Sequence, residues 1–178
     1  MPATAAWRRL CAIVPLTLAA FVATTALGAS GAHAVESDGG QVHQQEPHLP
    51  PVSVRINKAA NVALSHLGDP YRYGAAGPTA FDCSGLSMFS YGHASLNLPR
   101  TAAGQYGAVR HILKQTMMRG DLVFFHDGGG HVYHVGIFLY WNADHRAVIV
   151  HAPHSGTNVQ RAPVWTSSWY AGTRRPAR

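Results

Sequence analysis

The sequence predicts an α+β domain, because helical patterns come first along the chain and strand patterns follow. Residues 54–67 place apolar side chains at helical spacing and are followed by Gly68, which predicts a first helix. Short runs rich in Val, Ile and Phe at 122–125, 135–140 and 147–150 predict strands of one antiparallel sheet. The chain has 178 residues, of which 47% are hydrophobic, so it can bury the core of one domain.

The first 34 residues predict a secretory signal peptide. Arg8 and Arg9 precede an apolar run over residues 10–28, and the small-residue sequence Ala32-His33-Ala34 follows. We expect cleavage after Ala34, which gives an exported protein of the cell envelope without a stable membrane anchor. A retained anchor is the alternative, but proline and threonines interrupt the run and no basic cluster follows it.

Residues 35–52 are polar without an apolar period, and they predict a disordered lead-in before a folded domain at 53–178. This domain has twelve Arg and Lys against five Asp and no Glu, a net charge of +7. An anionic cell-wall polymer is the partner that this charge favours, and a basic surface kept only for solubility is the alternative. No nucleic-acid-binding motif is present.

Cys83 is the one cysteine that the mature protein would keep, because Cys11 lies within the predicted signal. After a turn-rich segment at 69–81, Asp82 stands where a helix N-cap would stand, and a second helix is predicted over 83–94. The start of a helix lowers the pKa of a thiol, which suits a nucleophile. A small buried hydrophobe is the alternative reading of this cysteine. A short third helix is predicted over 101–109.

Two histidines supply candidates for the base that such a nucleophile needs. If the strands 135–140 and 147–150 form a hairpin closed by a two-residue turn at Asn142-Ala143, His134 lies directly opposite His151. The two side chains would then share one face of the sheet, and one imidazole could orient the other.

Zinc binding is the rival interpretation of the histidines. His131, His134, His151 and His154 form two H-x-x-H pairs, and imidazole is a common zinc ligand. Residues three apart on a strand point to opposite faces, however, so one regular hairpin cannot aim all four at one ion. The folded part also has no Glu, which argues against a zinc site with a Glu base and against paired-carboxylate glycosidases.

Six motifs in order resemble the NlpC-type cysteine peptidases over about residues 54–175. They are Tyr71-Arg72-Tyr73-Gly74, Phe81-Asp82-Cys83-Ser84-Gly85-Leu86, Leu98-Pro99-Arg100-Thr101, Arg119-Gly120-Asp121-Leu122-Val123-Phe124-Phe125, His134-Val135-Gly136-Ile137 and His151-Ala152-Pro153. The resemblance implies a papain-like fold, in which the helix that carries the cysteine packs on an antiparallel sheet that carries the histidines. It also implies hydrolysis of bacterial peptidoglycan without a metal or organic cofactor.

The same resemblance assigns roles to the site residues. It implies that Cys83 is the nucleophile, that His134 is the general base and later the acid, and that His151 orients His134. Tyr71 would help at the oxyanion or shape the substrate pocket, together with the backbone N–H of Cys83.

Three further residues match positions that line the stem-peptide pocket in relatives: Asp82, Ser84 and Arg100. Read from the residues alone, they are a helix cap, a first-turn residue and a structural ion-pair partner. The implied activity is an endopeptidase that cleaves the stem peptide between γ-D-glutamate and a diamino acid such as meso-diaminopimelate. An amidase or acyltransferase of the same construction, or a non-catalytic wall-binding protein, are the alternatives.

Overall fold

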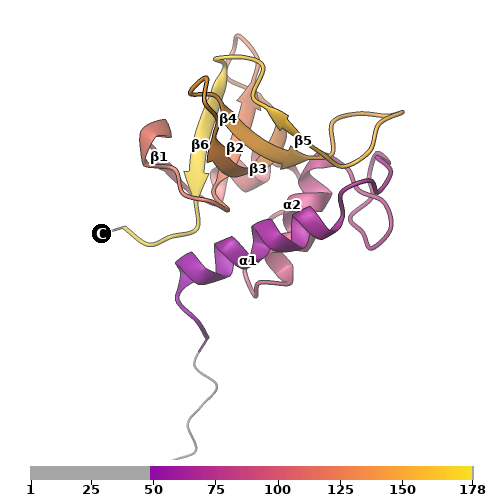
Figure 1. The fold of residues 1–178 in the computed structure, drawn as a ribbon, viewed down its shortest axis with the longest axis horizontal. Helices are drawn as coiled ribbons and strands as arrows, with labels where there is room; N and C mark the ends of the chain where they lie inside the picture. The colour runs from indigo at the N-terminus through magenta and orange to yellow at the C-terminus, as the bar shows by residue number, and fades with distance from the viewer. Residues whose placement is uncertain (1–48, 178) are drawn as a thin grey trace, which may run out of the picture. The chain divides into compact units, whose positions relative to one another are not determined.

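The computed structural model describes residues 49–177 and confirms the predicted α+β class (Figure 1). The predicted signal peptide and residues 35–48 of the predicted lead-in lie outside the described residues. Residues 49–51 have no regular secondary structure, and the first helix begins at Val52, the last residue of the predicted lead-in. Among the described residues, no helix combines the length and apolar character needed to cross a membrane.

Six strands form one antiparallel sheet in the order β1-β6-β2-β3-β4-β5. Their bounds are Arg110–Ile112 for β1, Leu122–His126 for β2, Val132–Trp141 for β3, Ala147–His151 for β4, Gln160–Pro163 for β5 and Trp169–Thr173 for β6. Of these, β2, β3 and β4 were predicted from the sequence. The edge strands β1 and β5 were not predicted because they are short and largely exposed, and β6 was not because glycine and threonine end its aromatic run.

Three α-helices precede most of the sheet: α1 (Val52–Ser65), α2 (Cys83–Gly92) and α3 (Ala102–Gly107). A single 3-10 turn, η1 (Lys114–Thr116), follows β1. The helix predictions are confirmed in kind, with ends that differ by one or two residues. Figure 1 shows α1 and α2 on the same side of the sheet. The buried side of α1 is mostly alanine, which lets its backbone lie close to its neighbours.

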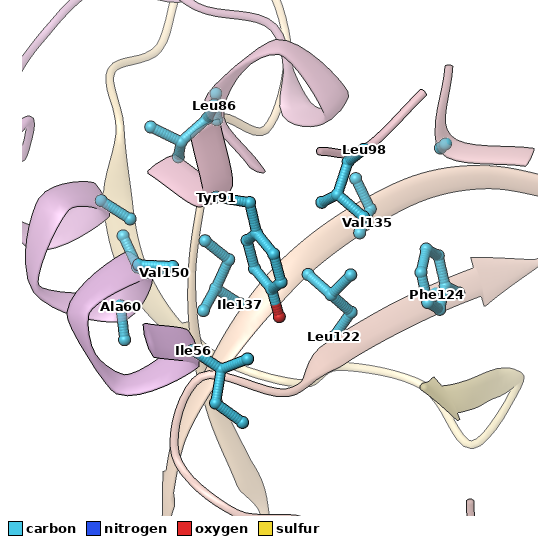
Figure 2. Packing of buried hydrophobic residues seen from close by; sticks show 14 of the residues in the cluster. Ile56, Ala60, Leu86, Tyr91, Leu98, Leu122, Phe124, Val135, Ile137 and Val150 are labelled. Atoms are coloured by element: carbon cyan, nitrogen blue, oxygen red, sulfur yellow. The ribbon is translucent and has the colours of Figure 1, made fainter. Parts of the chain in front are cut away.

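Both faces of the sheet are buried around strands β2, β3 and β4. The cluster on the helix side joins α1 and α2 to β2, β3 and β4, and Figure 2 shows Tyr91 at its centre with Ile56, Ile137 and Leu122 around it. A second cluster on the other face contains Phe125 and Ile149, among others. Because β2 is buried on both of its faces, its sequence is a continuous apolar run instead of an alternating one.

The Arg119-Gly120-Asp121 motif has a structural role. A side chain at Gly120 would bring its Cβ within 2.2 Å of the Ile56 carbonyl oxygen, so only glycine allows α1 to approach here. The buried carboxylate of Asp121 accepts hydrogen bonds from Thr173 (2.5 Å) and the Met118 N–H (2.8 Å) and pairs with Arg175. The motif therefore fastens the start of β2 to α1 and to the C-terminal segment.

The predicted two-residue turn between β3 and β4 is wrong. The Asn142 N–H donates to the Arg146 carbonyl (3.0 Å), so residues 143–145 form a three-residue loop. The Asn142 side chain closes this longer loop, because its oxygen accepts from the N–H groups of Asp144 (3.1 Å) and Arg146 (2.8 Å).

This loop and a bulge between Phe138 and Tyr140 pair Ile137 with Val150. Continued by one residue, that register places Gly136 opposite His151, so His134 is offset from the predicted partner by two residues. Because side chains alternate with a period of two, an offset of two keeps both histidines on the same face.

Candidate active site

Cys83 is the first residue of α2, and Asp82 caps that helix as predicted. The Asp82 carboxylate accepts a hydrogen bond from the Gly85 N–H at 2.7 Å. Gly85 itself cannot be replaced easily, because an added Cβ would lie 2.1 Å from the Ala75 carbonyl oxygen. The Asp-Cys-Ser-Gly sequence therefore fixes the cysteine at the helix start, where backbone N–H groups point outward.

The pKa of Cys83 is raised overall, contrary to the expectation from its position at the helix start. Burial raises the pKa of this thiol, and the negative charge of Asp82 adds to the rise. Hydrogen bonds from the backbone of Val135 and from Ser84 act in the opposite direction but do not outweigh burial. The contact with Val135 also shows that the sulfur lies against β3 next to His134.

His134 and His151 lie together on one face of the sheet, as predicted, although they are not directly opposite each other. The His134 Nε2 and His151 Nδ1 atoms are 2.9 Å apart, and the two side chains are 6% and 2% exposed. If Nε2 of His134 donates this hydrogen bond, its Nδ1 has a lone pair available for the proton of Cys83. The proton of His151 then lies on Nε2, a buried atom without a hydrogen-bond partner in the described part of the chain.

Both imidazoles are held neutral. Burial lowers the pKa of His134 to about 3 and that of His151 to about 4, with smaller contributions from neighbouring histidines. A neutral thiol therefore faces a neutral imidazole in the resting site. The pair can accept the thiol proton as the sulfur attacks, which is general-base chemistry.

Asp82, Ser84 and Arg100 form one saturated network beside the cysteine. Arg100 donates to both carboxylate oxygens of Asp82, at 2.9 and 2.5 Å, and to the Ser84 hydroxyl at 3.0 Å. The second oxygen of Asp82 also accepts from the Gly74 N–H at 2.9 Å. Burial alone would raise the pKa of Asp82, but the Arg100 and backbone hydrogen bonds outweigh it, so the pKa is lowered.

Gln105 is a buried residue of the site that was not predicted from the sequence. Its amide donates to the carbonyls of Ser84 (2.8 Å) and Pro99 (2.9 Å), and its oxygen accepts from the Ser87 hydroxyl (2.7 Å). These bonds tie the first turn of α2 to the segment that carries Arg100. A glutamine in a short helical pattern gives no signal of such a role.

Two adjoining pockets of about 680 and 210 Å³ meet at Cys83. Both are lined by Tyr71, Cys83 and Tyr133; Asp82, Ser84 and Arg100 line only the larger one, whereas His134 lines only the smaller one. Burial and the nearby Cys83 raise the pKa of Tyr71, so its hydroxyl stays a hydrogen-bond donor at the groove. Six of the seven predicted site residues therefore line one groove, and the seventh, His151, lies behind His134.

A hollow of about 820 Å³ lies elsewhere, between the start of α1, β1 and the C-terminal segment. It is larger than either groove pocket, but its lining contains no cysteine, histidine or carboxylate. Size alone would select it, whereas the chemistry selects the groove at Cys83.

His131 and His154 are exposed and line different pockets, on opposite sides of the cysteine. Within residues 49–177, no three side chains of His, Cys, Asp or Glu gather in a way that could hold a metal ion. The two H-x-x-H pairs of the sequence thus do not converge in space.

Comparison with known proteins identifies the construction. The sequence model of the NlpC/P60 family matches residues 68–178, more than half of the chain. The chain belongs to the NlpC/P60 family. Curated relatives include the probable endopeptidase p60 of Listeria monocytogenes, 44% identical over 77 residues, which are 43% of this chain and 16% of that protein.

Two further relatives of this NlpC/P60 chain match it over a larger share of their own length. The bifunctional muramidase/DL-endopeptidase CwlT of Bacillus subtilis is 45% identical over 82 residues, which cover 43% of this chain and 24% of CwlT. A probable endopeptidase of Corynebacterium glutamicum is 31% identical over 112 residues, which cover 63% of this chain and 49% of that protein. The chain thus spans at most about half the length of these curated relatives.

Solved structures of NlpC/P60 proteins share the papain-like fold. The peptidoglycan hydrolase RipB of Mycobacterium tuberculosis matches with a TM-score of 0.60 and 26% identity, over 71% of this chain and 67% of RipB. RipD of the same organism, described as a non-catalytic NlpC/p60 protein adapted to peptidoglycan binding, matches with a TM-score of 0.56 and 24% identity. That match covers 67% of this chain and 97% of RipD. The family therefore contains both hydrolases and a binding protein.

Proposed function

We propose that this NlpC/P60 chain is an exported cysteine endopeptidase that hydrolyses an amide bond in peptidoglycan stem peptides. The observation that carries the proposal is the position of Cys83 in an open groove, beside the buried His134–His151 pair. The similarity to CwlT, a bifunctional muramidase/DL-endopeptidase, and to RipB, a peptidoglycan hydrolase, supports the same substrate class. The bond that we propose joins γ-D-glutamate to a diamino acid such as meso-diaminopimelate.

The geometry supports the following sequence of steps. His134 takes the thiol proton as the Cys83 sulfur attacks the scissile carbonyl carbon, which forms a tetrahedral intermediate. The backbone N–H of Cys83 and the Tyr71 hydroxyl would donate hydrogen bonds to its oxyanion. His134 then returns the proton to the leaving amine, and a thioester forms on Cys83. Finally, water activated by His134 hydrolyses the thioester and restores the thiol.

Each neighbour of Cys83 and His134 has a supporting role in this scheme. His151 accepts the hydrogen bond from Nε2 of His134. This bond keeps the Nδ1 lone pair of His134 directed to the groove. Asp82 is saturated by Arg100 and the backbone, so it holds the larger pocket in shape without competing for the thiol proton. The net charge of +7 from residue 53 onward favours attraction to anionic wall polymers.

Digestion of purified sacculi tests the proposal. We expect the wild-type protein to release soluble peptides. The masses of these peptides should identify fragments that end at D-glutamate or begin at the diamino acid. Cys83→Ala should release none, and a thiol alkylator should abolish release whereas a chelator should not. Release of whole stems would establish an amidase instead. Retained binding to sacculi without any release would establish a wall-binding protein.

A further inference from the structure

The two pockets that meet at Cys83 differ in what they offer to a substrate. The larger pocket contains the saturated Asp82–Arg100 network and His131. The smaller pocket contains His134, Pro153, His154 and Trp165, and no carboxylate lines it. A stem peptide that places its scissile amide at Cys83 must put its acyl part in one pocket and its amine part in the other.

Proton transfer decides which part goes where. The leaving nitrogen must receive a proton from the general acid, and a proton donor has to lie within hydrogen-bond reach of its acceptor. His134 lines the smaller pocket only. We propose that the smaller pocket is the leaving-side subsite, which binds the diamino acid, and that Trp165 is the wall that determines its specificity. This inference rests on the proposed function.

Trp165 is held firmly although it lies outside the regular strands, between β5 and β6. One face of its ring stacks on buried Phe125, with centroids 4.2 Å apart and planes at 9°, yet the side chain is 51% exposed. The preceding carbonyl, of Val164, accepts two hydrogen bonds from Arg146, at 3.1 and 2.7 Å. A fixed and half-exposed indole ring suits the aliphatic chain of a diamino acid, because it buries methylene groups at little entropic cost.

His154 provides a polar group in the same pocket. Its Nδ1 lies 2.9 Å from the Ser155 carbonyl oxygen, which can only accept, so Nδ1 carries a proton. The other nitrogen, Nε2, then has a lone pair when the imidazole is neutral. The pocket therefore combines an apolar wall with a hydrogen-bond acceptor, which suits the methylene chain and the side-chain ammonium group of a diamino acid.

Separate measurements of acylation and deacylation distinguish a leaving-side wall from a role of Trp165 in supporting the histidines. The leaving residue is present only during acylation, so a leaving-side wall affects kcat/KM but not hydrolysis of the thioester. We would use two N-acetyl-L-alanyl-γ-D-glutamyl amides, one of meso-diaminopimelate and one of methylamine. The second substrate lacks the group that would contact Trp165.

We expect Trp165→Ala to lower kcat/KM for the diaminopimelate substrate about tenfold, the loss that goes with two unburied methylene groups. The methylamide substrate and the deacylation rate should not change. Trp165→Phe, which can keep the stacking on Phe125, should recover most of the loss, and His154→Ala should show a smaller loss with the same selectivity. His131→Ala is the matched control, because it lies in the other pocket and should affect both substrates equally.

An equal loss for both substrates, or a matching fall in deacylation, would overturn the inference and make Trp165 a positioning residue for His134. A loss confined to the diaminopimelate substrate in His131→Ala would place the leaving residue in the larger pocket. If the wild-type protein cleaves neither substrate and no sacculus, the proposed function fails and the subsite fails with it.

Discussion

Two polar clusters flank Cys83 and are built in opposite ways. The Asp82–Arg100 cluster is charged, and each carboxylate oxygen accepts from both Arg100 and a backbone N–H. The His134–His151 pair is neutral and more deeply buried, and its buried His151 Nε2 atom has no hydrogen-bond partner among residues 49–177. A saturated cluster cannot accept a proton without losing bonds, whereas the neutral pair can. The comparison indicates that the first cluster holds the shape of the groove and the second moves the proton.

Removing the base should have the largest effect. We expect His134→Ala to lower kcat/KM by about 1,000-fold, within the range for loss of general acid–base catalysis. Steady-state assays on a defined stem peptide measure this, and circular dichroism checks the fold. His131→Ala, an exposed histidine of the same groove, is the matched control and should lose much less. Equal losses in the two variants would contradict the assignment of the base.

Removing the second imidazole should have a smaller effect. His151→Ala should lower kcat about 100-fold, because His134 keeps its position less well but can still take the proton. His151→Asn offers an amide oxygen that can accept the Nε2 hydrogen bond, so it should retain about tenfold more activity than the alanine variant. If both substitutions have the same effect, the hydrogen bond from His134 does not orient the base.

The reactivity of Cys83 tests whether the resting pair is neutral. Because burial raises the pKa of this thiol, its rate of alkylation by iodoacetamide should climb about tenfold per pH unit through the neutral range. A preformed thiolate–imidazolium pair would instead give a rate that is level from mildly acidic to neutral pH. Such a level profile would show that the proton of Cys83 already lies on His134 before the substrate binds.

The Asp82–Arg100 cluster should contribute more to the stability of the fold than to proton transfer. Arg100→Ala leaves the Asp82 carboxylate with its backbone partners only, and we expect a loss of about 1–2 kcal/mol in the free energy of unfolding. The value lies below that for a fully buried pair because the Arg100 side chain is 38% exposed. Urea unfolding measures it. Arg110→Ala, which removes an exposed arginine bonded only to backbone carbonyls, is the control and should change little.

As the pH falls, the two clusters should lose their contributions to stability in different pH ranges. The folded pKa values of His134 and His151 lie below the ordinary 6.5, so the unfolded chain takes up protons first and stability falls from about pH 6.5 towards pH 4. Asp82 adds its loss only below its ordinary value of 3.8. Each imidazole contributes a slope of up to about 1.4 kcal/mol per pH unit. The double variant His134→Gln/His151→Gln should flatten the upper range, and an unchanged slope there would contradict the buried neutral pair.

The parts of the site that depend on local sequence were predictable. Asp82 as a cap and Cys83 at a helix start follow from neighbouring residues. The shared face of His134 and His151 was also predicted, although the turn was wrong, because an offset of two residues preserves the face. The pKa of Cys83 was predicted in the wrong direction, since helix position is local whereas burial depends on how β3 packs over the sulfur.

The remaining features could not be read from the sequence because they depend on distant contacts. Gln105 acts through carbonyls of residues 84 and 99, and Trp165 reaches the groove only because Phe125 and Arg146 hold it there. The polar edge strand β5, which leads to Trp165, carries no strand signal of its own. Its place follows from pairing with β4.

The most direct test of the central claim is to trap the thioester. The wild-type protein would be mixed with the N-acetyl-L-alanyl-γ-D-glutamyl amide of meso-diaminopimelate, quenched in acid within the first turnover and analysed by intact mass and peptide mapping. The account predicts an adduct with the mass of the acyl part on Cys83, removable by hydroxylamine and absent from Cys83→Ala. Product formed without any adduct, at a rate that Cys83→Ala retains, would contradict it.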